Sequence, residues 1–200
     1  MKHDRRQEII ASAMELFARK GFRGTTTRDL ATHAEINEAI IFRYFKTKEE
    51  LYSAIIESKV TVEKHNSGLE EFQRLAATND DEKFFQAIGR AFLEKHETDT
   101  TFLRLLLFSA LEGHQLSDMF AASMAARHPL TDYIQRRIDE GVFRDDVDAQ
   151  LSARAFLGMF ASYTLWQEIF GFKKKQSHDR EEVVRTFVSI FLQGITKLSI

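Results

Sequence analysis

The chain of 200 residues contains no cysteine, a single proline (Pro129) and only nine glycines. Without cysteine there is no disulfide framework, no thiolate metal site and no cysteine nucleophile, and this composition fits a reducing cytoplasm. So few turn-forming residues favour long helices over a many-stranded sheet. We therefore expect an all-α protein of about nine helices that works in the cytoplasm.

Long apolar runs are also missing. Residues 1–20 carry charges throughout, so they lack the uninterrupted apolar core of a signal peptide. The best candidate for a membrane span, residues 153–169, contains Arg154, Gln167 and Glu168. It is also shorter than the roughly 20 residues that a spanning helix needs. We expect no membrane as a partner.

The chain has little excess charge, and its net charge is −2. Residues 1–60 hold eleven Lys or Arg against nine Asp or Glu, so the N-terminal part is weakly basic and the remainder is acidic. This asymmetry is too weak to indicate nucleic acid by itself, and the distribution of motifs has to decide.

Motifs of catalysis are absent as well. We find no nucleophile–base pair, no paired carboxylates and no glycine-rich phosphate loop. His96 and His114 are not part of a histidine pair with metal-ligand spacing. We therefore expect no enzyme, no catalytic residues, no metal and no cofactor, and we rank an enzyme that uses the aromatic body far below the alternatives given below.

The most informative segment runs from Thr25 to Leu51 and predicts two short helices joined by a tight turn at Glu35 and Ile36. Thr26 or Thr27 is suited to cap the first helix, and Asn37 is suited to cap the second, expected over residues 38–45. A capped helix with Thr47 and Glu50 in capping-box spacing follows. This is the pattern of a helix-turn-helix that lays one helix into a DNA major groove.

Residues 4–51 resemble the DNA-binding domain of the tetracycline-repressor (TetR) family of bacterial transcription regulators. The matching words are ELFARKGFRGTTTRDLATHAEI and IIFRYFKTKEELYSAII, and GVFRDDVDAQLSARAFLGMF resembles the lead into the family's penultimate helix. The resemblance implies an N-terminal three-helix DNA-binding domain over residues 1–47. A C-terminal helical bundle for ligand binding and dimerisation would then occupy residues 48–200.

The resemblance also implies which residues meet double-stranded DNA. They lie at the start of the second helix, along the third helix that reads the groove, and at the start of the fourth. These residues are Thr27, Arg28, Asn37, Glu38, Ala39, Ile40, Phe42, Tyr44 and Lys48. Phosphate contacts fix register and base-edge contacts fix sequence.

Four positions depart from, or stand out against, the family pattern. The family usually has glycine where Glu35 and Ala39 stand, and tyrosine where Phe42 stands. Phe42 has no hydroxyl to donate to a phosphate. Glu38 brings a carboxylate close to the DNA, where it can accept from a cytosine amine. We expect modest affinity or an unusual operator.

The body is rich in phenylalanine, of which the chain has eighteen, and most of these side chains should form its core. A few polar groups among large aromatics are also typical of a small-molecule site. With the resemblance, this predicts an apolar or aromatic effector. The candidate ligand-binding residues are Phe92, His96, Phe102, Leu106, His114, Phe120, Phe160, Tyr163, Trp166 and Gln167.

The last two expected helices are apolar over wide arcs, which predicts that two subunits bury them in a four-helix interface. The TetR-like proteins dimerise at this place. The candidate interface residues are Phe156, Met159, Phe187, Val188, Phe191 and Ile195.

The leading interpretation is a homodimeric, ligand-responsive regulator, expected to be a repressor on a palindromic operator. An activator role stays open, because the sequence does not show promoter geometry. The alternative is a helical protein–protein adaptor that keeps the fold but has lost specific DNA binding, an idea motivated by Glu35, Glu38 and Phe42.

Overall fold

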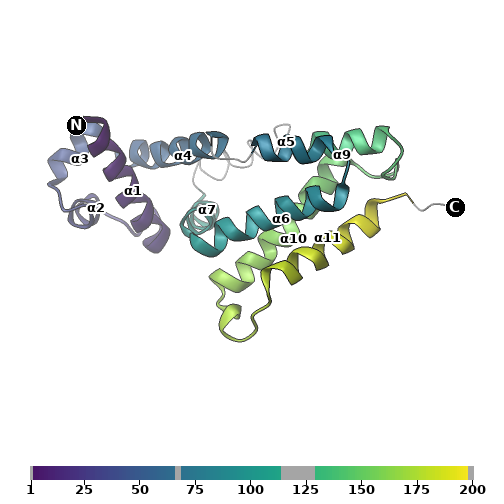
Figure 1. Ribbon diagram of the computed structural model, residues 1–200. Coiled ribbons are helices and arrows are strands. Elements are labelled where there is room, and N and C mark those ends of the chain that lie inside the picture. Colours follow the sequence, from purple (N-terminus) through teal and green to yellow (C-terminus); the bar gives the residue numbers. More distant parts are fainter. Residues whose placement is uncertain (1, 66–68, 114–128, 198–200) are drawn as a thin grey trace. The chain divides into compact units, whose positions relative to one another are not determined.

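The computed structural model describes residues 2–65, 69–113 and 129–197 (Figure 1). The described residues form ten α-helices and two short helices of other types, so the all-α prediction is confirmed. The α-helices are α1 Lys2–Lys20, α2 Thr27–His33, α3 Glu38–Tyr44, α4 Lys48–His65, α5 Leu69–Ala77, α6 Asp81–Thr98, α7 Thr101–Glu112, α9 Pro129–Asp139, α10 Ala149–Thr164 and α11 Arg180–Ile195. The short helices are the π-helix η1 Leu165–Ile169 and the 3-10 helix η2 Phe172–Lys174.

The predicted helix caps are formed by the side chains expected to form them. The Thr26 hydroxyl accepts the backbone N–H of Asp29 at 3.0 Å, and Asn37 Oδ1 accepts that of Ala39 at 2.9 Å. Each cap satisfies a backbone donor that the first turn of a helix leaves unpaired. These two caps fix where α2 and α3 begin, and therefore the length of the turn between them.

The capping box predicted for α4 is only half right. Thr47 accepts the backbone N–H of Glu50 at 3.0 Å, as expected. The Glu50 carboxylate, however, accepts the backbone N–H of Lys46 at 2.7 Å, one residue before the position that a capping box uses. The carboxylate still satisfies a donor at the start of the helix, so its stabilising role is similar.

Three helix boundaries differ from those that the apolar spacing of the sequence predicts. For residues 69–77 that spacing predicts only a turn or two of helix within a connection, and the structure has the full helix α5 there. The spacing also predicts a helix from Leu116 to Asp139, of which the described part begins at Pro129, a residue with no N–H to lose at a first helical position. The rest of that predicted helix lies outside the described residues. A helix predicted over residues 149–170 changes to a π-helix after Thr164.

The helices fall into two compact units, and each is described by itself. The first contains α1 to α4 and also α7, which comes from much later in the chain. Its core is a cluster of apolar side chains from all five helices, in which Phe17, Leu51 and Leu105 are fully buried. Helices α4 and α7 thus pack with the helix-turn-helix, although both lie beyond the division that we expected at residue 47.

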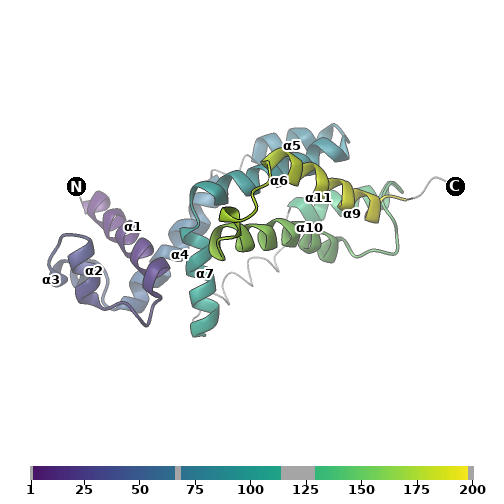
Figure 2. The same cartoon turned by 90° about the horizontal axis from the view of Figure 1, so that it is seen from below.

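The second unit contains α5, α6, α9, α10 and α11, and both ribbon views show α6, α10 and α11 side by side (Figure 2). Its centre is aromatic: the Phe85 ring lies 4.9 Å from that of Phe156 and 5.0 Å from that of Phe191. Such offset and edge-to-face pairs add to the free energy gained by burying apolar area. The phenylalanine-rich core predicted for the body is confirmed here.

A buried ion pair connects α6 and α9 in this unit. Arg137 is 8% exposed, and its Nε and Nη2 donate to the two carboxylate oxygens of Asp81, each at 2.8 Å. Tyr133 donates its hydroxyl to the same carboxylate at 2.6 Å. Burial, and then this hydrogen bond, raise the pKa of Tyr133 well above its usual range.

Across the described helices, none combines the length and apolar character that a membrane crossing requires.

Candidate nucleic-acid interface and effector site

Helix α3, the expected reading helix, has one face in the core and one face in solvent. Ile41 and the following Phe45 are buried, while Ile40 and Tyr44 pack partly against the same cluster. Residues on the opposite side are exposed, and Phe42 keeps 45% of its surface open to solvent. The helix therefore presents a defined outward face that is available for DNA.

The predicted DNA-binding residues occupy different environments. Arg28, Ala39 and Phe42 are exposed, whereas Thr27, Glu38 and Tyr44 are half-buried. Asn37 is exposed, but its side-chain oxygen Oδ1 accepts the backbone N–H of Ala39 and so caps α3. Ile40 packs partly against the core of the first unit, so only part of its side chain is available to contact a base.

Lys48, predicted as a phosphate ligand, has a structural role in this unit. Its Nζ donates to the backbone carbonyls of Phe22 and Thr25, both at 2.9 Å, and lies 4.1 Å above the centre of the Phe22 ring. The ammonium thus ties the start of α4 to the loop before α2. A phosphate contact by Lys48 stays a prediction, and such a contact would compete with these bonds.

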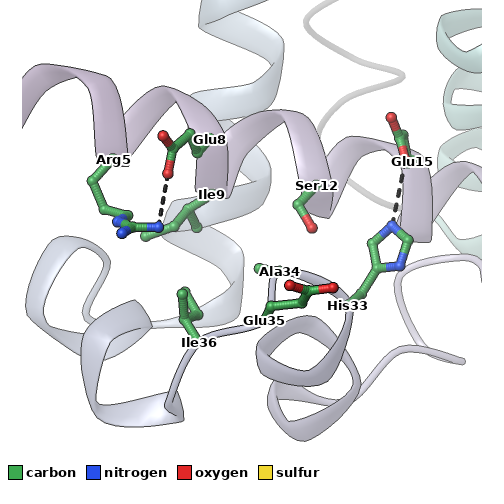
Figure 3. A pocket seen from close by; sticks show the side chains of 9 residues that line it. All are labelled: Arg5, Glu8, Ile9, Ser12, Glu15, His33, Ala34, Glu35 and Ile36. Carbon is green, nitrogen blue, oxygen red and sulfur yellow. Dashed lines mark hydrogen bonds and ion pairs between the residues drawn. The ribbon is translucent and has the colours of Figure 1, made fainter.

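The turn between α2 and α3 contains a strained residue. Glu35 has φ of 53°, in the left-handed region that glycine adopts without cost. Glycine is also what the family resemblance led us to expect there. Figure 3 shows Glu35 with Ala34 and Ile36 across a cleft of about 410 Å³ from Ile9 and Ser12 of α1. The Glu35 side chain therefore lines this cleft next to α1.

Helix α7 is connected to the loop that precedes the helix-turn-helix. The Glu112 carboxylate accepts the backbone N–H of Phe22 at 3.0 Å and that of Arg23 at 3.2 Å, and the Arg23 side chain donates to the Glu112 carbonyl at 3.1 Å. Gly21 makes this contact possible: a Cβ there would lie 2.6 Å from Glu112 Oε1. We did not predict this contact, because no local pattern relates residues 90 positions apart.

The capping carboxylate of α2 is strongly stabilised in its charged form. Asp29 accepts the backbone N–H of Thr26 at 2.9 Å and its hydroxyl at 2.7 Å. These hydrogen bonds, with a smaller contribution from Lys20, lower the pKa of Asp29 to about 2. The start of α2 is therefore held by a charged group at neutral pH.

The predicted effector residues are divided between the two units. Phe102 and Leu106 belong to α7 in the first unit, and Leu106 packs against that unit's core. The remaining described members lie in the second unit. His114 and Phe120 fall outside the described residues. Phe160 is fully buried among other rings of the second unit's core, and its contact with an effector stays a prediction.

Five of the predicted effector residues lie near the end of α6, at the end of α10 or in η1, namely Phe92, His96, Tyr163, Trp166 and Gln167. His96 stacks on Phe92 with ring centres 4.4 Å apart, and Tyr163 is half-buried against Phe187. Gln167 lies in the π-helix η1, and its Oε1 is buried without a hydrogen-bond partner among the described residues. π-Helical turns often mark functional positions.

Most of the predicted dimer residues lie in the protomer's own core. Phe156, Val188, Phe191 and Ile195 are buried, and Met159 and Phe187 pack partly against them. These side chains therefore form the core of the protomer, in which α6 packs against α10 and α11. Their contact with a second subunit stays a prediction.

The family models agree with this geometry at both ends of the chain. A model for bacterial regulatory proteins of the tetR family matches residues 9–55, and a model for the C-terminal domain of AefR-like transcriptional repressors matches residues 84–194. The second match alone spans more than half of the chain. The chain belongs to the TetR family. It is a DNA-binding transcriptional repressor.

Curated relatives match along nearly the whole length. The uncharacterized HTH-type transcriptional regulator YvkB of Bacillus subtilis is 25% identical over 191 residues, covering 95% of this chain and 96% of the relative. The HTH-type transcriptional repressor KstR2 of Mycobacterium tuberculosis is 25% identical over 204 residues, covering 98% and 94%. These matches include the C-terminal body, in which only the segment GVFRDDVDAQLSARAFLGMF resembles the family by sequence pattern.

Solved structures share the fold. A TetR-family regulator from Mesorhizobium loti has a TM-score of 0.71 at 20% identity, with 98% of each chain covered. FadR from Bacillus subtilis, in complex with stearoyl-CoA, has a TM-score of 0.67 at 14% identity, covering 94% of this chain and 98% of that one. AibR, in complex with isovaleryl coenzyme A and operator DNA, has a TM-score of 0.68 at 17% identity, covering 93% and 97%.

Proposed function

We propose that this repressor binds a palindromic operator as a homodimer in the cytoplasm and is released by an apolar effector that carries a hydrogen-bond donor. The proposed effector site rests on Gln167, whose Oε1 is buried and has no hydrogen-bond partner among the described residues. No catalytic step is assigned to the chain.

The Gln167 carboxamide is a costly feature unless a ligand completes it. A buried polar atom without a hydrogen bond loses its interaction with water and gains nothing in return. Gln167 is placed by the π-helix η1, whose neighbours Trp166 and Ile169 are apolar. A ligand with an apolar body and an N–H or O–H group would pack against these neighbours and satisfy the oxygen.

Acyl thioesters of coenzyme A have this combination of groups, because an apolar chain is joined to amide N–H donors. Two structural neighbours, FadR and AibR, are complexes with stearoyl-CoA and isovaleryl coenzyme A. Both support the choice of this class for the first trials. The effector acts only to the extent that it binds the DNA-free arrangement of the dimer more tightly than the DNA-bound one.

The test is a titration of protein–DNA complex with a series of acyl-CoA thioesters of increasing chain length. At least one member should lower operator affinity tenfold or more for the wild type. Gln167→Leu should keep wild-type affinity for DNA but need a much higher concentration of the same thioester. Gln176→Leu changes the same residue type in an exposed loop and should respond like the wild type.

If no thioester releases DNA, the effector class is wrong. If the Gln167→Leu variant responds like the wild type, the placement of the site is wrong. Both outcomes leave the DNA-binding role of the chain untouched, because operator affinity is measured separately in each variant.

The dimer is proposed to form through the outward faces of α10 and α11. Leu151 is 64% exposed and Ile190 is 59% exposed, although both are large and apolar. Gly158 and Gly194 share these helices, and a Cβ added at either would meet nothing within 4 Å. A second copy of the chain could therefore approach the backbone closely and cover both exposed side chains.

Ile190→Asp tests the interface. A charge in an apolar interface is left without a partner, so the variant should sediment as a monomer at concentrations where the wild type is a dimer. Leu111→Asp places the same change on an exposed leucine of α7 and should leave the dimer intact. A dimeric Ile190→Asp variant would argue against this interface.

A further inference from the structure

The outward face of α3 has an apolar centre and a cationic end. Ala39, Phe42 and Arg43 follow one another at spacings of three and one residues, which places them on one side of α3, and Lys46 follows two residues after the helix ends. All four are exposed. The buried Ile41 and Phe45 on the other side fix this orientation, so the face cannot rotate into the core.

We propose that Phe42 and Ala39 read thymine in the operator through its 5-methyl group. This deepens the DNA-binding function and rests on it. Neither side chain has a hydrogen-bond donor or acceptor, so neither can read the polar edges of the bases. Among the groups that base pairs present in the major groove, the thymine methyl is the apolar one. An aromatic ring that is 45% exposed gains most by covering such a group.

The neighbouring side chains leave this central role to Phe42. Asn37 caps α3 with its side-chain oxygen Oδ1, which lies 2.9 Å from the backbone nitrogen of Ala39. Glu38 is half-buried and only accepts hydrogen bonds when charged, so its partner would be an amine of cytosine or adenine. Ile40 and Tyr44 are turned towards the core.

The charges around the apolar centre match the DNA backbone. Arg43 lies over the Tyr44 ring, with its guanidinium carbon 5.4 Å from the ring centre, and stays exposed. Lys46 follows at the end of α3, and Arg28 is exposed on α2. These cations can bind phosphates while the apolar centre faces the groove. Phosphate contacts would then position the protein on the DNA, and the apolar side chains would contact the bases.

The experiment begins by selecting DNA from a random double-stranded pool with the full-length protein. Each thymine of the selected operator is then replaced, one at a time, by deoxyuridine. This change removes only the 5-methyl group and keeps base pairing with adenine. Equilibrium affinities are measured for the wild type, Phe42→Ala, Phe42→Tyr and the matched control Phe170→Ala, which removes an exposed ring of the other unit.

For the wild type, deoxyuridine at one or two positions of each half-site should lower affinity about fourfold, the value expected for losing one buried methyl group. Phe42→Ala should bind the thymine operator more weakly and show no further loss with deoxyuridine at those positions. Phe42→Tyr keeps the ring and should keep the effect, and Phe170→Ala should behave like the wild type. Melting temperatures confirm that each variant is folded.

Two results would overturn the inference. If no deoxyuridine substitution changes wild-type affinity, or if Phe42→Ala is as sensitive as the wild type, Phe42 does not read a methyl group although the protein binds DNA. If selection enriches no sequence at all, the DNA-binding function itself fails, and this inference fails with it. The two failures are distinguished at the selection step.

Discussion

The left-handed conformation of Glu35 should cost stability that glycine would recover. A non-glycine residue in this region is disfavoured by about 1–2 kcal/mol, because its Cβ crowds the backbone. Replacement by glycine would remove this strain but would cost about 0.5–1 kcal/mol, because a chain with glycine at this position has more conformational freedom to lose on folding. Because Glu35 has φ of 53°, the Glu35→Gly variant should have a free energy of unfolding about 0.5–1 kcal/mol higher than that of the wild type. For a chain of this size the melting temperature should rise by about 1–4 °C.

The assay is urea unfolding followed by circular dichroism, with three comparison variants. Glu35→Gln removes the charge and keeps the Cβ, so its stability should stay close to that of the wild type. Glu35→Asn should fall between wild type and Gly, because asparagine tolerates this conformation. Glu38→Gly makes the same substitution at the first residue of α3 and should lower stability, by at most about 1 kcal/mol.

Substitution by glycine should change the free energy of unfolding in opposite directions at positions 35 and 38. If Glu35→Gly is no more stable than Glu35→Gln, the turn does not hold Glu35 in the left-handed region under strain. If Glu35→Gln alone gives the full gain, the cost at this position is electrostatic, through Glu8 and Glu15 that line the same cleft.

Three further predictions concern contacts outside the reading helix. Glu112→Ala leaves the backbone donors of Phe22 and Arg23 without their acceptor and should lower the free energy of unfolding by about 1–3 kcal/mol in a urea titration. Asp81→Ala leaves Arg137 buried without its main partner, so it should cost about 3–5 kcal/mol in the same assay; a loss below 1 kcal/mol would contradict this. Because the folded-state pKa of Asp29 is lowered to about 2, the stability difference between wild type and Asp29→Asn should be complete above about pH 4 and disappear as the pH falls towards 2, as measured by thermal melting across that range.

The DNA-binding unit could be predicted well because its signals are local. Caps at Thr26 and Asn37, a turn at Glu35 and the apolar spacing of α3 each act within a few residues. The same spacing places Phe42 and Arg43 on the outward face of α3, whereas Lys46 lies beyond the end of the helix. Reading which side of α3 is buried requires only the positions of Ile41 and Phe45.

The contacts of α7 and the roles of Lys48 and the last helices could not be predicted in this way. The bond between Glu112 and the loop at Phe22 joins distant segments and leaves no periodic trace. A lysine at a helix N-terminus looks like a phosphate ligand whether or not nearby carbonyls already hold it. The apolar arcs of α10 and α11 could serve a dimer or a core equally well, and packing against α6 decided for the core.

The most direct test of the account is equilibrium binding of the full-length protein to DNA fragments from around its own gene, measured as a function of salt. We predict saturable binding to one fragment, with affinity that falls steeply as salt rises and a shallower salt dependence for Lys46→Ala. Equal, weak binding to every fragment by a stably folded dimer would contradict it. That result would favour the helical adaptor that keeps the fold without reading DNA.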